Sequence, residues 1–154
     1  MKLIPLLLLA ALASGQALAA PHSLLWADLN ANANASSVFE RINPELNGQQ
    51  VVIPGFVIEN SVASHLGDDH HHQADSDQPT ITVLSPQPEI CFHKPPPPAN
   101  QLIQVKLLPG VEVKATEGKP VYLIGELQVE KHLSGLFSTA YTLVVSDTAE
   151  YPSQ

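Results

Sequence analysis

The chain has 154 residues, enough for one domain and not comfortably for two. It carries 15 Asp and Glu against 7 Lys and Arg, a formal net charge of −8. A chain this acidic does not attract phosphate backbones, so we expect no nucleic-acid partner. The chain has a single cysteine, which excludes an internal disulfide and leaves a thiol that is buried, paired with another chain, reactive or a ligand.

The first 19 residues have the features of a secretory signal peptide. Met1–Lys2 gives a positive start, an apolar run covers residues 3–13, and Ala17–Ala19 is a small-x-small cleavage site. The apolar run is shorter than the roughly 20 residues that a membrane span needs. No cysteine follows it as a lipid attachment site. We therefore expect a soluble exported protein with no membrane anchor.

Residues 20–47 predict an N-terminal arm with short helical turns. Residues 31–35 alternate Asn and Ala, as a linker does, and Asn43–Pro44 ends a predicted helical turn over residues 37–42. We expect the arm to lay Trp26 on the surface of the following domain. The apolar residues that can share one face of its first turn are Leu24, Leu25, Trp26 and Leu29.

Residues 48–154 predict a domain built from strands. Pro54–Gly55 and Gly125 predict sharp bends in two of them. Two-residue alternation of apolar and polar side chains favours half-buried antiparallel strands. We therefore expect a mainly β fold, a small five-to-six-stranded antiparallel barrel, with a β-sandwich as the alternative. The predicted strands are residues 49–59, 80–85, 102–108, 119–132 and 140–147, with a weak sixth at 111–114.

A loop rich in His and Asp, residues 60–79, separates the first two predicted strands. Loops of this length in a compact domain are usually functional or disordered. Imidazoles and carboxylates suit zinc, with copper or nickel as alternatives. Adjacent histidines on an extended chain point to opposite faces, so one ion rarely takes all of them. We expect low-to-moderate affinity for a divalent metal, the alternative being a solvated polar loop. The candidate ligands are His65, Asp68, Asp69, His70, His71 and His72.

Cys91 and His93 lie two residues apart in the string E-I-C-F-H-K-P-P-P-P-A-N-Q, residues 89–101. On an extended segment their side chains project to the same face. A thiolate and an imidazole placed in this way form half of a tetrahedral zinc site, part of a copper site, or a nucleophile with its base. The alternatives are a buried structural cysteine, a structural histidine, or a pair that faces a partner chain.

Four prolines follow this pair and form a polyproline II rod about 12 Å long. Such a rod is a stiff brace for the residues before it or an exposed docking surface. The side-chain amides that follow it are placed to bond its free carbonyls. The binding residues expected in this segment are Pro95, Pro96, Pro97, Pro98, Asn100 and Gln101.

The string C-F-H-K-P-P-P-P-A-N-Q, followed by L-I-Q-V, resembles the C-[IF]-H-x-P-P-P-P-x-N-Q signature of a bacterial exported family, domain of unknown function 3299. Three further strings resemble strands of that family: L-N-G-Q-Q-V-V-I-P-G-F-V-I, V-Y-L-I-G-E-L and T-A-Y-T-L. The resemblance covers residues 46–145. Two departures are L-S-P-Q-P-E-I (residues 84–90), where the family usually has V-P-[YF]-x-G-A, and the lack of an evident helix in residues 109–120.

The resemblance implies a periplasmic protein with a small barrel similar to the OB-fold. It also implies genes that often neighbour envelope transporter components, in some bacteria under zinc-responsive control. It carries over no catalytic residue, and no third orienting residue accompanies Cys91 and His93, so we expect no enzyme. We expect a metal-binding accessory protein, with zinc first. The alternative is a non-enzymatic adaptor that docks on an envelope transporter complex.

Overall fold

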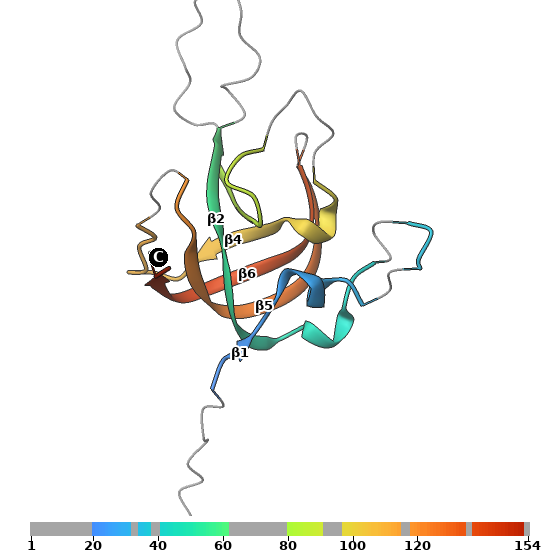
Figure 1. Ribbon diagram of the computed structural model, residues 1–154, viewed down its shortest axis with the longest axis horizontal. Coiled ribbons are helices and arrows are strands. Elements are labelled where there is room, and N and C mark those ends of the chain that lie inside the picture. Colours follow the sequence, from blue (N-terminus) through green and yellow to red (C-terminus); the bar gives the residue numbers. More distant parts are fainter. Residues whose placement is uncertain are drawn as a thin grey trace, which may run out of the picture.

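The computed structural model describes residues 20–31, 34–37, 41–61, 80–90, 97–114, 118–134 and 137–152 (Figure 1). These residues form a mainly β fold with one mixed sheet of six strands and three short 3-10 helices. The strands are β1 (His22–Ser23), β2 (Gln49–Ser61), β3 (Thr80–Ser85), β4 (Ile103–Leu107), β5 (Val121–Ser134) and β6 (Phe137–Glu150). The 3-10 helices are η1 (Trp26–Leu29), η3 (Pro44–Leu46) and η5 (Ala99–Gln101).

The five principal strands confirm the predicted strand positions, but the sheet is not wholly antiparallel. Its order is β1-β2-β3-β4-β6-β5, and β2 also pairs with β5, so the pairing returns to β2. The pairs β1–β2 and β4–β6 are parallel, which corrects the expectation of an antiparallel barrel. β6 forms an antiparallel hairpin with β5 and pairs on its other edge with β4, in the same direction as β4. All six described strands belong to one sheet, whereas a β-sandwich requires two.

Two glycines allow the long strands to bend, as the sequence predicts. β2 pairs with β5 up to Gly55 and with β3 from Phe56 onward. A Cβ atom on Gly55 would lie 2.8 Å from Leu84 Cγ, so the close approach of β3 requires glycine. Gly125 lies where the pairing of β5 with β6 shifts register, and a Cβ atom there would clash with the Val144 carbonyl oxygen.

One hydrophobic core packs against the sheet. Alternate residues of the strands supply its centre, because successive side chains of a strand point to opposite faces. The predicted weak strand at residues 111–114 does not form, although Val111 and Val113 pack against the core. The fully buried strand residues of this cluster include Val51, Ile53, Leu84, Ile103, Leu123, Leu127, Tyr141 and Leu143.

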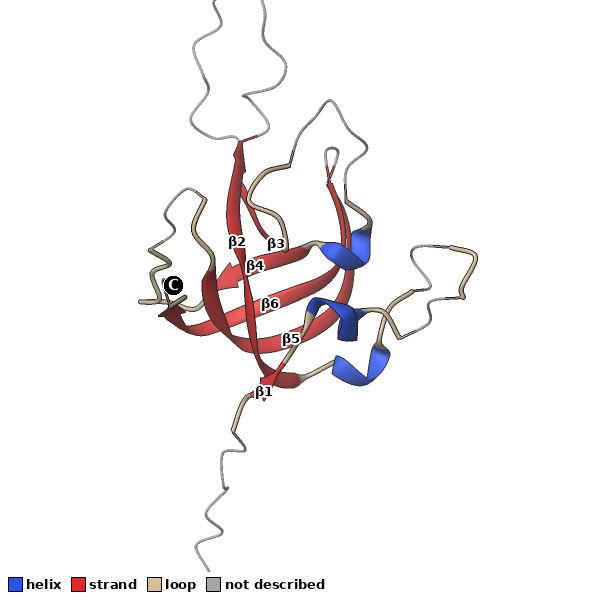
Figure 2. Ribbon diagram, viewed as in Figure 1, coloured by secondary structure: helices blue, strands red, loops and turns tan. Residues whose placement is uncertain are grey.

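The N-terminal arm contributes to this same core. Leu24, Leu29 and Leu46 are buried in it, whereas Leu25 is 62% exposed. Trp26 is partly buried, and its indole Nε1 donates a hydrogen bond to the Pro54 carbonyl oxygen at 2.7 Å. The three 3-10 helices gather at one end of the sheet (Figure 2). No helix among the described residues is long and apolar enough to cross a membrane.

Candidate functional site

All eight predicted metal ligands lie outside the described residues. The predicted signal peptide at residues 1–19 also lies outside them, as do residues 62–79 of the predicted capture loop 60–79. The predicted site residues concerned are His65, Asp68, Asp69, His70, His71, His72, Cys91, His93, Pro95 and Pro96. The structure does describe the chain on either side of both segments.

The two ends of the His/Asp-rich segment are held side by side. Ser61 ends β2 and Thr80 begins β3, and these two residues are register partners in the antiparallel β2–β3 pair. Five further pairs continue this ladder as far as Phe56 and Ser85. The segment therefore begins and ends at adjacent positions on one rigid pair of strands.

The proline-rich string ends in the 3-10 helix η5, which places Asn100 against the N-terminal arm. Pro98 precedes η5, and its carbonyl oxygen accepts a bond from the Gln101 backbone N–H at 2.8 Å. Asn100 is only 3% exposed, and its Nδ2 donates to the Arg41 carbonyl oxygen at 3.1 Å. The described partner of the Asn100 amide is thus the N-terminal arm, and the predicted bonds to the carbonyls of Pro95 and Pro96 lie outside the described residues. Asn100 Oδ1 is buried with no hydrogen-bond partner among the described residues.

A second buried group, the hydroxyl of Tyr141, holds the same arm. Tyr141 Oη donates to the Leu29 carbonyl oxygen at 2.6 Å and accepts from the Asn43 backbone N–H at 2.7 Å. Burial raises the pKa of the Tyr141 phenol, which keeps the hydroxyl proton available for the first of these bonds. Asn43 in turn caps η3, because its side chain accepts a bond from the Glu45 N–H at 3.2 Å. Residues from both the signature and β6 therefore fix the arm.

The structure also brings together four polar residues that the sequence analysis did not select. Glu130 Oε2 lies 2.9 Å from His132 Nε2, 3.4 Å from Thr142 Oγ1 and 3.6 Å from Lys106 Nζ. His132 Nε2 also lies 3.1 Å from Thr142 Oγ1. The hydrogen bond from His132 is the largest cause that lowers the pKa of the Glu130 carboxyl, and the charges of His132 and then of Lys106 lower it further. The E-x-H spacing in a predicted strand was the available signal.

This polar cluster is not arranged as a hydrolytic triad. In a Ser–His–acid relay, one ring nitrogen faces the hydroxyl and the other faces the carboxylate. Here the same nitrogen of His132, Nε2, contacts both Thr142 and Glu130. The cluster is therefore an ion-pair and hydrogen-bond network across β4, β5 and β6.

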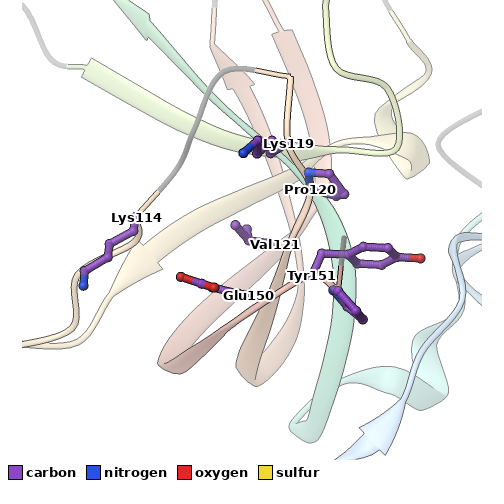
Figure 3. Close-up of a pocket in the computed structure, with 7 residues that line it drawn as sticks. Lys114, Lys119, Pro120, Val121, Glu150 and Tyr151 are labelled. Carbon is purple, nitrogen blue, oxygen red and sulfur yellow. The ribbon is translucent and has the colours of Figure 1, made fainter. Parts of the chain in front are cut away.

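A hollow of about 420 Å³ lies where the β4–β5 connection meets the C-terminal end of β6. Figure 3 shows the side chains of Glu150 and Tyr151, adjacent in the chain, projecting in different directions from its wall. The Tyr151 ring stacks on Tyr122 with centroids 5.0 Å apart. The lining combines both signs of charge with apolar groups: Lys114, Lys119, Pro120, Val121, Glu150, Tyr151 and Pro152.

Within the described ranges, no three residues of the types His, Cys, Asp and Glu are grouped as a metal site would need. The predicted ligands of residues 62–79 and 91–93 fall outside those ranges. A site built from these predicted ligands therefore stays a prediction.

Comparison with known proteins identifies the family. The chain is similar to a solved structure, a DUF3299 family protein from Pseudomonas aeruginosa PAO1, at 22% identity and a TM-score of 0.63. The similarity covers 88% of this chain and 99% of that one, and at this identity it shows the fold. No curated protein matches the chain. The family model described as "Protein of unknown function (DUF3299)" matches residues 16–150, and the chain belongs to this family.

Proposed function

We propose that the protein is an exported, periplasmic metal-binding accessory protein that captures or hands over a divalent ion, zinc in the first place. The observation that carries the proposal is the pairing of Ser61 with Thr80. It closes the base of a segment that contains four histidines and four aspartates, a ligand set that suits zinc. Holding both ends of a loop lowers the entropy that ligand convergence costs.

The buried anchor of Asn100 supports a role for the second segment, Cys91 and His93. The signature string is tied at its C-terminal end through the Asn100–Arg41 hydrogen bond and the Gln101–Pro98 bond. A rigid flank limits the positions that the preceding thiol and imidazole can take. Precise placement on a rigid element is what a metal-ligand pair requires.

We infer that the strands form an OB-like barrel that serves as the rigid base for these segments. The pairing cycle β2-β3-β4-β6-β5-β2 and the parallel β4–β6 pair support this inference. Residues 108–114 and 118–120 contain no helix, so the helix between middle strands of a typical OB-fold has no counterpart in that described part of the connection.

Zinc titration of the metal-stripped full chain, followed by calorimetry, tests the proposal. We expect a variant with His70→Ala, His71→Ala and His72→Ala to lose a bound equivalent or to bind about tenfold more weakly. A Cys91→Ser, His93→Ala variant separates the contribution of the second segment. His22→Ala removes an exposed histidine of β1 and is the matched control. Wild-type stoichiometry and affinity in both the loop variant and the Cys91/His93 variant would refute the proposal.

A second candidate function is an adaptor for an envelope transporter complex. It is favoured by exposed apolar residues at the end of β4. Leu107 and Leu108 are 46% and 43% exposed at the start of the connection that lines the hollow. Exposed apolar side chains beside a hollow are typical of protein-binding surfaces. Capture of a transporter component that requires Pro95–Pro98 and survives chelation would favour the adaptor over metal handling.

A further inference from the structure

Three donor atoms of β5 and β6 converge at the spacing of metal ligands. His132 Nε2, Glu130 Oε2 and Thr142 Oγ1 are separated by 2.9, 3.1 and 3.4 Å. Around a tetrahedral zinc ion with bonds of about 2.0–2.1 Å, neighbouring ligand atoms lie roughly 3.3 Å apart. We propose that these three residues form a site for a divalent cation such as zinc, separate from residues 62–79 and 91–93.

The chemistry of the three donors fits such an ion. Imidazole nitrogen and carboxylate oxygen are ordinary zinc ligands, and the threonine hydroxyl is a weaker oxygen donor. The ion replaces the proton that Nε2 shares with Glu130, because a metal-bound imidazole nitrogen must be deprotonated. Water completes the coordination shell. Two strong protein ligands predict weak, exchangeable binding, as opposed to a closed structural site.

The strands hold the donors in place before any ion arrives. Val129 pairs with Tyr141 and His132 pairs with Thr139, so β5 advances three positions where β6 advances two. This bulge places Glu130 and His132 beside Thr142, which is fully buried. The Glu130 and His132 side chains are 48% and 31% exposed, which leaves one side open to water and ions. Donors on paired strands lose little freedom when an ion binds.

Lys106 is the group that opposes binding. Its Nζ lies 3.6 Å from Glu130 Oε2, and the Lys106 side chain is 49% exposed. The Lys106 ammonium forms an ion pair with the Glu130 carboxylate and repels a divalent ion. An exposed ion pair of this kind is weak, so an ion can displace the lysine. Removing the lysine charge should therefore strengthen metal binding, an effect that a purely structural ion-pair network does not predict.

This site rests on the proposed metal-binding function but uses none of the ligands proposed in residues 62–79 and 91–93. The two proposals can therefore be refuted separately. The background is the full chain with His70→Ala, His71→Ala, His72→Ala and Cys91→Ser, stripped of metal and titrated with zinc chloride. We expect one residual equivalent, weakened about tenfold or more by His132→Ala and by Glu130→Gln, and strengthened by Lys106→Gln. His22→Ala is the histidine control, and circular dichroism checks folding.

Amide NMR of the same background reports the location of the ion, with shifts expected at Glu130, His132 and Thr142. Absence of residual binding, or residual binding that none of the three variants changes, overturns this site. Either result leaves the proposal for the loop intact if the wild-type chain needs the loop histidines to bind zinc. Binding that depends on His132 and not on the loop histidines supports this site and refutes capture by the loop.

Discussion

The hydroxyl of Tyr141 in β6 accepts a hydrogen bond from the backbone N–H of Asn43 at 2.7 Å, across 98 positions of sequence. The same hydroxyl donates to Leu29 at 2.6 Å. A single phenol on the sheet thus satisfies two backbone groups of the N-terminal arm. The arm is consequently part of the folded unit, because its detachment would leave those groups and its buried leucines without partners.

Tyr141→Phe should lower the free energy of unfolding by about 2–4 kcal/mol, since it leaves a buried carbonyl and a backbone N–H unpaired. Urea denaturation measures the loss. Tyr122→Phe is the control, because Tyr122 is only partly buried and its ring stacking on Tyr151 survives the change. Equal stability of the two variants would contradict the role assigned to the Tyr141 hydroxyl.

The raised pKa of Tyr141 predicts a loss of stability in alkali. The unfolded phenol ionises near its ordinary pKa of about 10, whereas the buried phenol keeps its proton to higher pH. Stability from this group is therefore complete below about pH 10 and declines as the pH rises toward the folded-state pKa. The midpoint of urea denaturation, measured between about pH 8 and about pH 11, should fall more steeply with rising pH in wild type than in Tyr141→Phe. Parallel curves would show that other groups cause the decline.

Asn100→Ala should cost about 1–3 kcal/mol of unfolding free energy, because it removes the donor to Arg41 and opens space beside a buried turn. Gln101→Ala should change stability by about 0.5 kcal/mol or less, since the bond of Gln101 to a described residue comes from its backbone N–H, which the substitution keeps. Chemical denaturation of the two variants compares adjacent residues of one signature. A larger loss for Gln101→Ala would mean that the anchoring residue has been misassigned.

The sequence located strands well because burial on one side of a strand leaves a two-residue pattern in the chain. β3 has the predicted bounds, Thr80–Ser85, and Gly55 and Gly125 lie at the predicted bends. The same pattern does not encode direction, since a half-buried strand alternates identically beside a parallel or an antiparallel neighbour. The parallel β4–β6 pair could therefore not be inferred from alternation.

The site residues show a similar division. The Asn100–Arg41 bond joins positions 59 apart, and no local pattern of residue types predicts such a contact. The Lys106–Glu130–His132–Thr142 network spans three strands, and its members are ordinary polar residues when each strand is considered alone. Both features depend on contacts between residues far apart in the sequence. They could therefore not be predicted without knowing which strands pair.

Gly125→Ala should be among the most damaging single-methyl changes, costing about 2–4 kcal/mol, because the new Cβ atom meets the Val144 backbone and neither strand can yield easily. Gly118→Ala is the comparison. Gly118 has φ of 70° with open space around it, so only backbone strain of about 1–2 kcal/mol is added. Thermal and urea unfolding should rank the two variants in this order, and the reverse order would contradict the close contact at the β5 bulge.

The Glu130 carboxyl should titrate below the ordinary value of 4.5 in the folded protein. Because the folded pKa is depressed, Glu130 contributes stability above the unfolded pKa, and this contribution is lost as the pH falls through the folded pKa. Carboxyl carbon NMR should show a rise in the Glu130 pKa in His132→Ala and a smaller rise in Lys106→Ala, since the hydrogen bond from His132 is the principal cause. A larger rise in Lys106→Ala would instead make the lysine charge the principal cause of the lowered pKa.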